Sequence, residues 1–407
     1  MSAVRTILVS GATGYIASRL IPRLLEQGYR VRCLARNSQR LRARAWFPQV
    51  EVAIGDVTRA ESLNEAMRGV SAAYYLVHSM AAGHGYHRLD LQSARNFASA
   101  AQSAGVEHII YLGGLADPAE KLALHLRSRI ETGAALREAG VPVTEFRAGV
   151  IAGPGSVSFE MIRFLAELFP LMLGPRWLNH RSQPIAASDI IEYLLAALVT
   201  PACRGEIVEL GCERSRSYIE VMAEYARLRG LKRAALLLPC IPPWLMAFFI
   251  DKLTPVAFSY ALPLVEGLQN DSLVRDSAAR RLFPAIEPLD YAEAVRRSLA
   301  ELDPRRVERL WLDSGRERAR LKHEGFFVDF RELRGAQALP TFPLAGGWET
   351  VDRPAPGVFL LKAGGRLPGE LWLEREERPG GRTFQTVFFA PKDLGGFLYW
   401  LLLRFWL

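Results

Sequence analysis

Short apolar runs alternate with amphipathic stretches from the start of the chain to about Val150. Helical spacing of apolar residues fills the intervals between the runs. A β-α-β alternation of this kind is typical of a parallel sheet covered by helices on both faces, so the pattern predicts an α/β, Rossmann-type doubly wound parallel sheet. The predicted strands lie near residues 6–10, 29–35, 50–54, 73–77, 108–112 and 143–147.

The pattern changes after this region. Residues 159–302 have mostly helical spacing, with strand-like runs only at 205–210 and 236–238, and they predict a helix-rich cap on the ligand side of the sheet. Residues 303–322 are rich in Arg, Glu and Asp, and this charge predicts a connector between domains. We therefore expect a first domain over residues 1–302, including the cap.

The last part of the chain, residues 323–407, is expected to form a second, smaller domain. Its strand-like runs are separated by Gly and Pro turns, which predicts an antiparallel β (α+β) unit. The final segment, 396–407, is apolar and aromatic with a single cation, so we expect it to pack on a domain, a partner or a membrane interface. The runs are 358–362, 370–374 and 383–389.

The length, net charge and cysteine content of the chain limit the classes of function that it can have. A length of 407 residues exceeds what one core usually supports, in agreement with two domains. The net charge is +8, but only six of the 51 basic residues are lysine and the arginines are spread along the whole chain, so the charge does not indicate nucleic-acid binding. Four cysteines without metal-ligand spacing, and the lack of an export signal, predict a cytoplasmic protein. Peripheral contact with the inner face of the membrane, through 396–407, is left open, and the oligomeric state is not predicted.

The first predicted strand leads directly into the glycine-rich turn Gly11-Ala-Thr-Gly14. Glycines here permit a tight turn and let backbone N–H groups approach a pyrophosphate, whose charge the N-terminus of the next helix favours. The turn therefore predicts binding of a nicotinamide dinucleotide. The predicted cofactor-binding residues of this segment are Gly11, Thr13, Gly14, Tyr15 and Ile16.

Arg36 ends the second predicted strand, at roughly the 20-residue spacing where NAD-binding sites place an acid on the ribose 2′-hydroxyl. A guanidinium at that place suits a 2′-phosphate, and Arg40 and Arg42 follow it. We therefore predict NADP(H) as the cofactor and leave NAD(H) open. The alternative is that Arg36 is an ordinary solvated arginine of an Arg-rich chain.

Several motifs together carry a resemblance to a known family over about residues 5–300. With the glycine turn, they resemble the atypical short-chain dehydrogenases/reductases of the NmrA-like, NAD(P)H-binding kind. The resemblance is to the bacterial subgroup whose C-terminal domain is similar to polyketide-cyclase-like lipid-binding domains; residues 330–357, which hold the first half of that domain, look shortened here. The motifs are Ala73–Met80, Ile109–Leu115, His125–Arg129, Val143–Ala148, Gln183–Ala186 with Asp189, and Arg280–Pro284.

The resemblance implies further contacts to the cofactor. Asp56 and Val57 would meet the adenine, and Gly113 would lie on the floor of the cofactor cleft. The segment after the fourth strand would flank the adenosine and nicotinamide riboses; its residues are Leu76, Val77, His78 and Ser79.

Catalysis is less clearly indicated. Family enzymes that transfer hydride pair a tyrosine with a lysine four residues later, so that the cation lowers the pKa of the phenol. This chain has His125 and Arg129 at the equivalent place, one helical turn apart. His125 is a candidate for proton transfer and Arg129 for orienting the cofactor, while a purely structural role is the alternative. His78 is the second candidate for a chemical role.

Two other features have plainer interpretations. His84, His87 and Asp90 form a run without a fourth strong ligand, so no metal is expected. Asp189 is predicted to cap a helix over 190–198. The apolar stretch 239–249, which includes Trp244 and Phe248, is predicted to lie in a buried core; an apolar substrate pocket and a membrane contact are the alternatives.

The resemblance and these residues favour an NADP(H)-dependent oxidoreductase that acts on an apolar small molecule. A non-catalytic NADP(H) sensor or assembly scaffold is the alternative, because the Tyr-x-x-x-Lys pair is absent from the sequence. A third interpretation, a lipid-handling module, depends on the apolar C-terminal segment.

Overall fold

The computed structural model describes residues 5–42, 44–78, 85–254, 256–302, 326–333, 338–355, 357–378 and 382–406. The chain forms two compact units, each assembled from three stretches. Unit 1 comprises Met1–Gly153, Trp177–Tyr218 and Ser259–Ala294, and unit 2 comprises Pro154–Arg176, Ile219–Phe258 and Val295–Leu407. The stretch proposed as a cap, 159–302, contributes to both units. The proposed connector, 303–322, lies outside the described residues.

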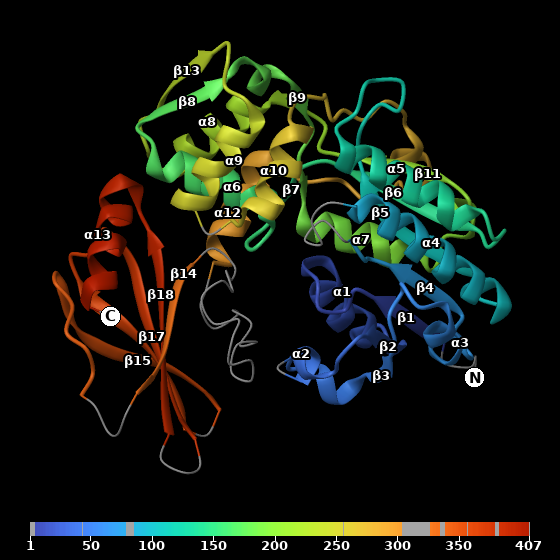
Figure 1. The fold of residues 1–407 in the computed structure, drawn as a ribbon, viewed down its shortest axis with the longest axis horizontal. Helices are drawn as coiled ribbons and strands as arrows, with labels where there is room; N and C mark the ends of the chain where they lie inside the picture. The colour runs from blue at the N-terminus through green and yellow to red at the C-terminus, as the bar shows by residue number, and fades with distance from the viewer. Residues whose placement is uncertain are drawn as a thin grey trace. The chain divides into compact units, whose positions relative to one another are not determined.

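Unit 1 is built on a seven-stranded sheet in which every pair of neighbouring strands is parallel (Figure 1). The order β11-β6-β5-β4-β1-β2-β3 reverses direction between β1 and β4, so the predicted doubly wound sheet is confirmed. The run predicted near 205–210 forms its edge strand, β11. The strands are β1 (Thr6–Ser10), β2 (Arg30–Ala35), β3 (Glu51–Ile54), β4 (Ala72–Tyr75), β5 (His108–Gly114), β6 (Val143–Ala148) and β11 (Ile207–Leu210).

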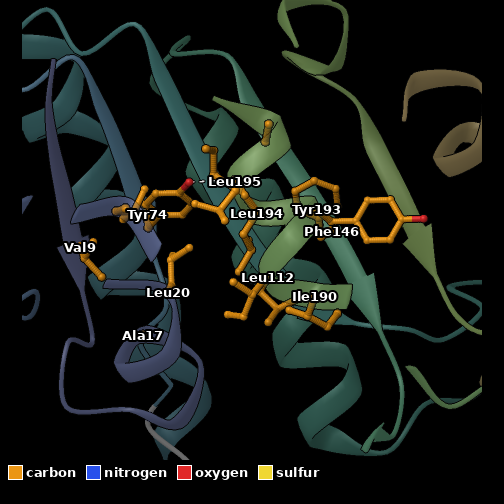
Figure 2. Packing of buried hydrophobic residues seen from close by; sticks show 14 of the residues in the cluster. Val9, Ala17, Leu20, Tyr74, Leu112, Phe146, Ile190, Tyr193, Leu194 and Leu195 are labelled. Carbon is orange, nitrogen blue, oxygen red and sulfur yellow. Dashed lines mark hydrogen bonds between the residues drawn. The ribbon is translucent and has the colours of Figure 1, made fainter. Parts of the chain in front are cut away.

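Helices cover both faces of this sheet. Because successive strand residues point to opposite sides, each strand contributes side chains to two cores. Ile7 and Val9 of β1 enter one core with α1 and α7, whereas Leu8 enters the other with α3, α4 and α5. Figure 2 shows the first core, where the Tyr74 hydroxyl donates to the Leu194 carbonyl at 2.8 Å. The helices are α1 (Tyr15–Glu26), α3 (Leu63–Met67), α4 (Tyr86–Ser103), α5 (Leu124–Arg137) and α7 (Ala187–Ala197).

Short elements complete unit 1. β7 pairs with β10 in parallel, and β9 pairs with β12 in antiparallel fashion. Three helices, α8, α10 and α12, begin in one unit and end in the other. The elements are α2 (Gln39–Arg42), β7 (Ile151–Ala152), β9 (Arg181–Ser182), β10 (Ile185–Ala186), β12 (Arg216–Ser217), α8 (Tyr218–Leu228), α10 (Phe258–Gly267), α11 (Ala278–Leu282) and α12 (Tyr291–Ala300).

Unit 2 contains a five-stranded antiparallel sheet in the order β14-β18-β17-β16-β15. This sheet confirms the antiparallel β fold predicted for the last part of the chain. Figure 1 shows α13 lying along one face of this sheet, where Trp400 stacks on Phe389 of β18. The three predicted strands are present, and two more, β14 and β15, occupy much of the region that looked shortened. The elements are β14 (Phe327–Leu333), β15 (Ala345–Ala355), β16 (Val358–Gly365), β17 (Gly369–Arg378), β18 (Arg382–Pro391) and α13 (Asp393–Trp406).

The rest of unit 2 is helical, apart from a parallel two-stranded ribbon of β8 and β13. Helix α9 follows β13 after a short loop, and no described helix is long and apolar enough to cross a membrane. The elements are α6 (Val157–Leu168), β8 (Leu171–Pro175), β13 (Ala234–Leu238) and α9 (Pro243–Leu253).

Two local predictions are wrong. Asp189 does not cap α7, which has Ala186 at its N-cap; instead its carboxylate accepts a hydrogen bond from the Leu289 N–H at 2.8 Å. Trp244 is 59% exposed rather than buried, because α9 buries the opposite face through Ala247 and Ile250.

Candidate functional site

The glycine turn lies where β1 ends, beside the end of β4. Gly11 has φ +68°, and a Cβ built there would lie 2.5 Å from the Leu76 carbonyl oxygen, so only glycine fits this conformation and this contact. The Gly14 N–H donates to the Gly11 carbonyl at 2.8 Å and closes the turn. Helix α1 starts at Tyr15 with no side-chain cap and no acid in its first turn. The N–H groups of its first turn and its positive dipole end therefore suit a pyrophosphate.

Ser10 joins the two strand ends that flank the turn. Its hydroxyl donates to the Tyr74 carbonyl at 2.9 Å and accepts from the Leu76 N–H at 3.3 Å. Leu76, Val77 and His78 are consequently half-buried next to the turn, at the switch point of the sheet where ligands of such folds bind. Ser79 lies outside the described residues.

The ends of β2 and β3 supply the other side of the proposed cofactor site. Arg36 is exposed directly after β2, and its guanidinium has no hydrogen bond or ion pair to the part of the chain that the structure describes. Asp56 holds its own loop, because one carboxylate oxygen accepts from the Thr58 N–H at 3.0 Å, and Val57 is buried. Arg44, which the sequence did not single out, is buried and donates to the Thr13 carbonyl at 3.4 Å.

A second cluster adjoins this region and is built from side chains of three elements. His78 Nδ1 lies 3.2 Å from Asp90 Oδ2, and the Ser128 hydroxyl donates to the same oxygen at 3.1 Å. Asp90, on α4, is buried. Burial lowers the pKa of His78, and the charge of Arg129 lowers it further, while the hydrogen bond to Asp90 acts in the opposite direction. A neutral His78 that donates its Nδ1–H to Asp90 leaves Nε2 as an acceptor.

Arg129 is anchored at the end of β5. Its guanidinium donates to the Leu112 carbonyl and lies 5.3 Å from the centre of the Tyr111 ring, and the Tyr111 hydroxyl donates to the Arg129 carbonyl at 2.9 Å. Burial raises the pKa of Tyr111, so its phenol stays protonated near neutral pH. Gly113 is buried beside this ring, and a Cβ there would lie 3.1 Å from Tyr111 Cε1.

His125 shares α5 with Arg129 but is buried. Burial lowers the pKa of His125 to about 3, and the charges of His78 and Arg129 act in the same direction. Its Nδ1 has no hydrogen-bond partner within the described residues, and its ring fills the space above Gly267, where a Cβ would lie 2.2 Å from Cε1. At neutral pH the imidazole is uncharged, which does not suit an imidazolium acid.

The described residues of the His84, His87 and Asp90 run have different partners in the structure. His87 Nε2 contacts Glu131, whereas Asp90 faces His78, and His84 lies outside the described residues. Among the residues that are described, no group of three or more His, Cys, Asp or Glu side chains is placed to hold a metal ion.

Comparisons with known proteins agree with the fold and its glycine turn. The family model described as NAD(P)H-binding matches residues 11–139. The chain is 26% identical over 234 residues to the photosystem II assembly factor Ycf39 of Cyanophora paradoxa, covering 55% of this chain and 69% of that protein. It is 27% identical over 238 residues to a ceramide reductase of Caulobacter vibrioides, covering 57% and 73% respectively.

A solved structure supports the same conclusion about the fold. An NADPH-dependent quinone oxidoreductase of Escherichia coli, complexed with NADPH, superposes with a TM-score of 0.57 at 20% identity, over 72% of this chain and 99% of that one. Residues 11–139 thus form an NAD(P)H-binding domain, and the fold is shared with solved structures described as a nucleoside-diphosphate-sugar epimerase and an NADPH-dependent quinone oxidoreductase.

Proposed function

Because this chain carries an NAD(P)H-binding domain within an oxidoreductase-like fold, we propose that it is an NADP(H)-dependent oxidoreductase that reduces an apolar carbonyl or quinone. The observation that carries the proposal is the His78–Asp90 pair. It places a titratable imidazole, held by a buried carboxylate, directly after the strand end that contacts the glycine turn. Perturbed titratable groups at such a place are typical of reaction sites.

The chain's own residues account for cofactor binding. Gly11 and Gly14 let the main chain approach the pyrophosphate, and Arg36 binds the 2′-phosphate of NADP(H) through a guanidinium that is not engaged by the described residues. The bound cofactor supplies the hydride. Arg129, fixed to the Leu112 carbonyl, holds its positive charge beside His78 and orients the nicotinamide end of the site.

The remaining requirement is a proton for the substrate oxygen. We assign it to His78, whose Nδ1–H is held by Asp90: Nε2 takes up a proton from water, and the resulting imidazolium passes that proton to the oxygen as the oxygen gains the electron pair of the reduced bond. Asp90 fixes the tautomer and stabilises the charged ring, and Ser128 orients Asp90. His125 remains neutral and packs against Gly267 as a positioning residue. The similarity to a ceramide reductase supports an apolar substrate.

The test is titration calorimetry with NADPH and NADH, followed by turnover assays with short-chain quinones and aliphatic aldehydes. We expect NADPH to bind more tightly than NADH, and we expect oxidation of NADPH by at least one acceptor class. His78→Gln should lower kcat and leave NADPH affinity unchanged, whereas His125→Gln should alter kcat much less. Tight NADPH binding with no turnover by any acceptor would overturn the reductase proposal.

That last outcome would favour a non-catalytic NADP(H) sensor or assembly scaffold. Two observations support this second candidate. His125, at the place of the family tyrosine, is uncharged at neutral pH, and the chain is similar to a photosystem II assembly factor. A sensor should change its protease sensitivity or its partners when NADPH binds, without consuming it.

A further inference from the structure

The β8–β13 ribbon of unit 2 displays leucines to solvent. The parallel register pairs Leu173 with Leu236, so alternate residues of both strands share one face. Leu173 is 58% exposed, and the residues of that face are Leu171, Leu173, Leu236 and Leu238, all exposed. Met172, between two of them, is buried. The ribbon therefore has an apolar exposed side, and on its other side β8 buries Met172 and Gly174; such a row of exposed leucines is unusual for a surface that meets only water.

Helix α9, which follows the ribbon after a short loop, repeats this arrangement. Trp244, Phe248 and Phe249 are spaced to lie on one face of the helix and are all exposed, Phe249 by 51%. Ala247 and Ile250 lie on the opposite, buried face. The exposed aromatic side chains are not needed to attach α9 to its unit, so they are available for another contact.

Basic residues outnumber acidic ones around these two elements, and the one acid of α9, Asp251, pairs with Lys252. The segment 225–250, which includes β13 and most of α9, holds four cations and no acid. Three of the cations are engaged within the unit: Arg227 pairs with Glu224, Arg229 pairs with Glu167, and Arg233 donates to the Ala166 and Glu167 carbonyls. Lys232 is exposed next to β13, and Arg176 is exposed directly after β8. The apolar face is thus bordered by solvated cations.

We propose that the exposed faces of β8, β13 and α9, together called the ribbon–helix surface, lie on an anionic lipid bilayer. Leucines and aromatic rings would enter the boundary between headgroups and acyl chains, and Lys232 and Arg176 would pair with anionic headgroups. The contact is peripheral, since no described helix can span a membrane. A second copy of the chain fits less well, because a twofold interface would bring the same cations together.

This assignment differs from the contact expected at the C-terminus. Helix α13 also exposes leucines, Leu398 and Leu402, but its other face is packed on the antiparallel sheet and it begins with Asp393. Lys392 and Arg404 are far apart in its sequence, so α13 lacks a clustered cationic border. It provides a matched control of similar apolar exposure within the same unit.

The experiment is co-sedimentation of the full chain with vesicles of phosphatidylcholine alone and of phosphatidylcholine mixed with phosphatidylglycerol. We expect binding to the anionic vesicles, at least about tenfold weaker binding to neutral ones, and weakening as salt rises. The double variant Phe248→Glu with Phe249→Glu should lose at least about tenfold in affinity. Leu398→Glu with Leu402→Glu should bind as the unaltered chain does.

Three results would overturn the proposal: no binding to anionic vesicles, loss confined to the α13 variant, or a dimer in light scattering that the α9 variant abolishes. Circular dichroism and the thermal midpoint of both variants guard against misfolding. As an independent readout, Lys232→Glu should weaken binding and reduce its salt dependence, because one headgroup contact is lost.

Discussion

The two parts of the proposed site meet at the switch point between β1 and β4 but are built differently. The glycine turn is made of main chain, and its shape depends on Gly11 having no side chain. The His78 cluster is made of side chains from three elements, and it depends on Asp90 being buried where it can accept two hydrogen bonds. The residues of the main-chain part are contiguous in the sequence, whereas those of the side-chain part are distant in the sequence and come together only in the fold.

The largest effect should come from the main-chain part. Gly11→Ala places a methyl group against the Leu76 carbonyl in a left-handed conformation, so the turn must move. We expect at least about a 100-fold loss of NADPH affinity, since shifts near 1 Å in a positioned site have such effects. The free energy of unfolding should fall by roughly 1–2 kcal/mol. Titration calorimetry and urea unfolding measure the two quantities.

Gly28→Ala is the matched control. Gly28 also has a positive φ, +80°, but a Cβ there meets nothing within 4 Å. It should therefore reproduce the backbone strain and leave NADPH affinity unchanged. Equal affinity losses in both variants would mean that strain, rather than the contact with Leu76, accounts for the effect of Gly11→Ala.

The next effect tests the cofactor preference. Arg36→Asp removes the guanidinium and places a carboxylate where a ribose 2′-hydroxyl would lie, so NADPH affinity should fall by about 10- to 100-fold, the value of a charge-assisted hydrogen bond. NADH affinity should stay the same or rise. Fluorescence titration with both cofactors measures the ratio, and equal losses would contradict the 2′-phosphate assignment. Arg68→Asp, at the exposed C-terminal end of α3, controls for a general change of charge.

A smaller effect is expected in the side-chain part. Asp90→Asn keeps the size of the residue but removes the charge that holds His78 Nδ1–H, so kcat should fall about tenfold while NADPH affinity is retained. Because the carboxylate raises the pKa of His78, and His78 donates its proton in the charged form, the alkaline limb of the kcat profile should also move to lower pH. Asp276→Asn, whose exposed carboxylate accepts a hydrogen bond from the Ala278 N–H of its own turn, is the control. A loss of NADPH affinity in Asp90→Asn would assign Asp90 to cofactor binding instead.

The sequence predicted the main-chain part of the proposed site better than the part made of side chains. Period-2 and period-3.6 patterns located the strands of the parallel sheet, because both faces of that sheet are covered and its strands are apolar throughout. The glycine turn was equally legible. Asp90 was noticed only as a weak metal candidate, since its partners His78 and Ser128 come from other elements and no spacing joins them.

The sequence pattern also could not predict which apolar side chains are exposed to solvent. Trp244 and its neighbours read as core because apolar residues usually are, and only the packing of Ala247 and Ile250 decides which face of α9 is covered. In the antiparallel sheet, β14 and β15 were missed because their residues are mixed in polarity; β14 reads Phe-Val-Asp-Phe-Arg-Glu-Leu, and its side chains are at most half-buried.

The smallest expected effect is a dependence of the free energy of unfolding on pH, to which two buried histidines should contribute. His108, at the start of β5, and His125, on α5, are buried, and burial lowers the pKa of His108 to about 4 and that of His125 to about 3. Arg5 and Arg204 lower the pKa of His108 further, as His78 and Arg129 do for His125.

The unfolded chain binds protons on these residues near pH 6.5, but the folded chain does not until the pH falls to about 4 and about 3. Stability is therefore fully present above pH 6.5 and decreases as the pH falls toward those values, by about 1 kcal/mol per histidine at pH 5.5. Urea unfolding at pH 7.5 and 5.5 measures the loss. His108→Gln, which keeps a polar partner for the Thr144 hydroxyl, should remove the part due to His108 and leave that of His125. An unchanged pH dependence in this variant would show that His108 titrates alike in the folded and unfolded chain.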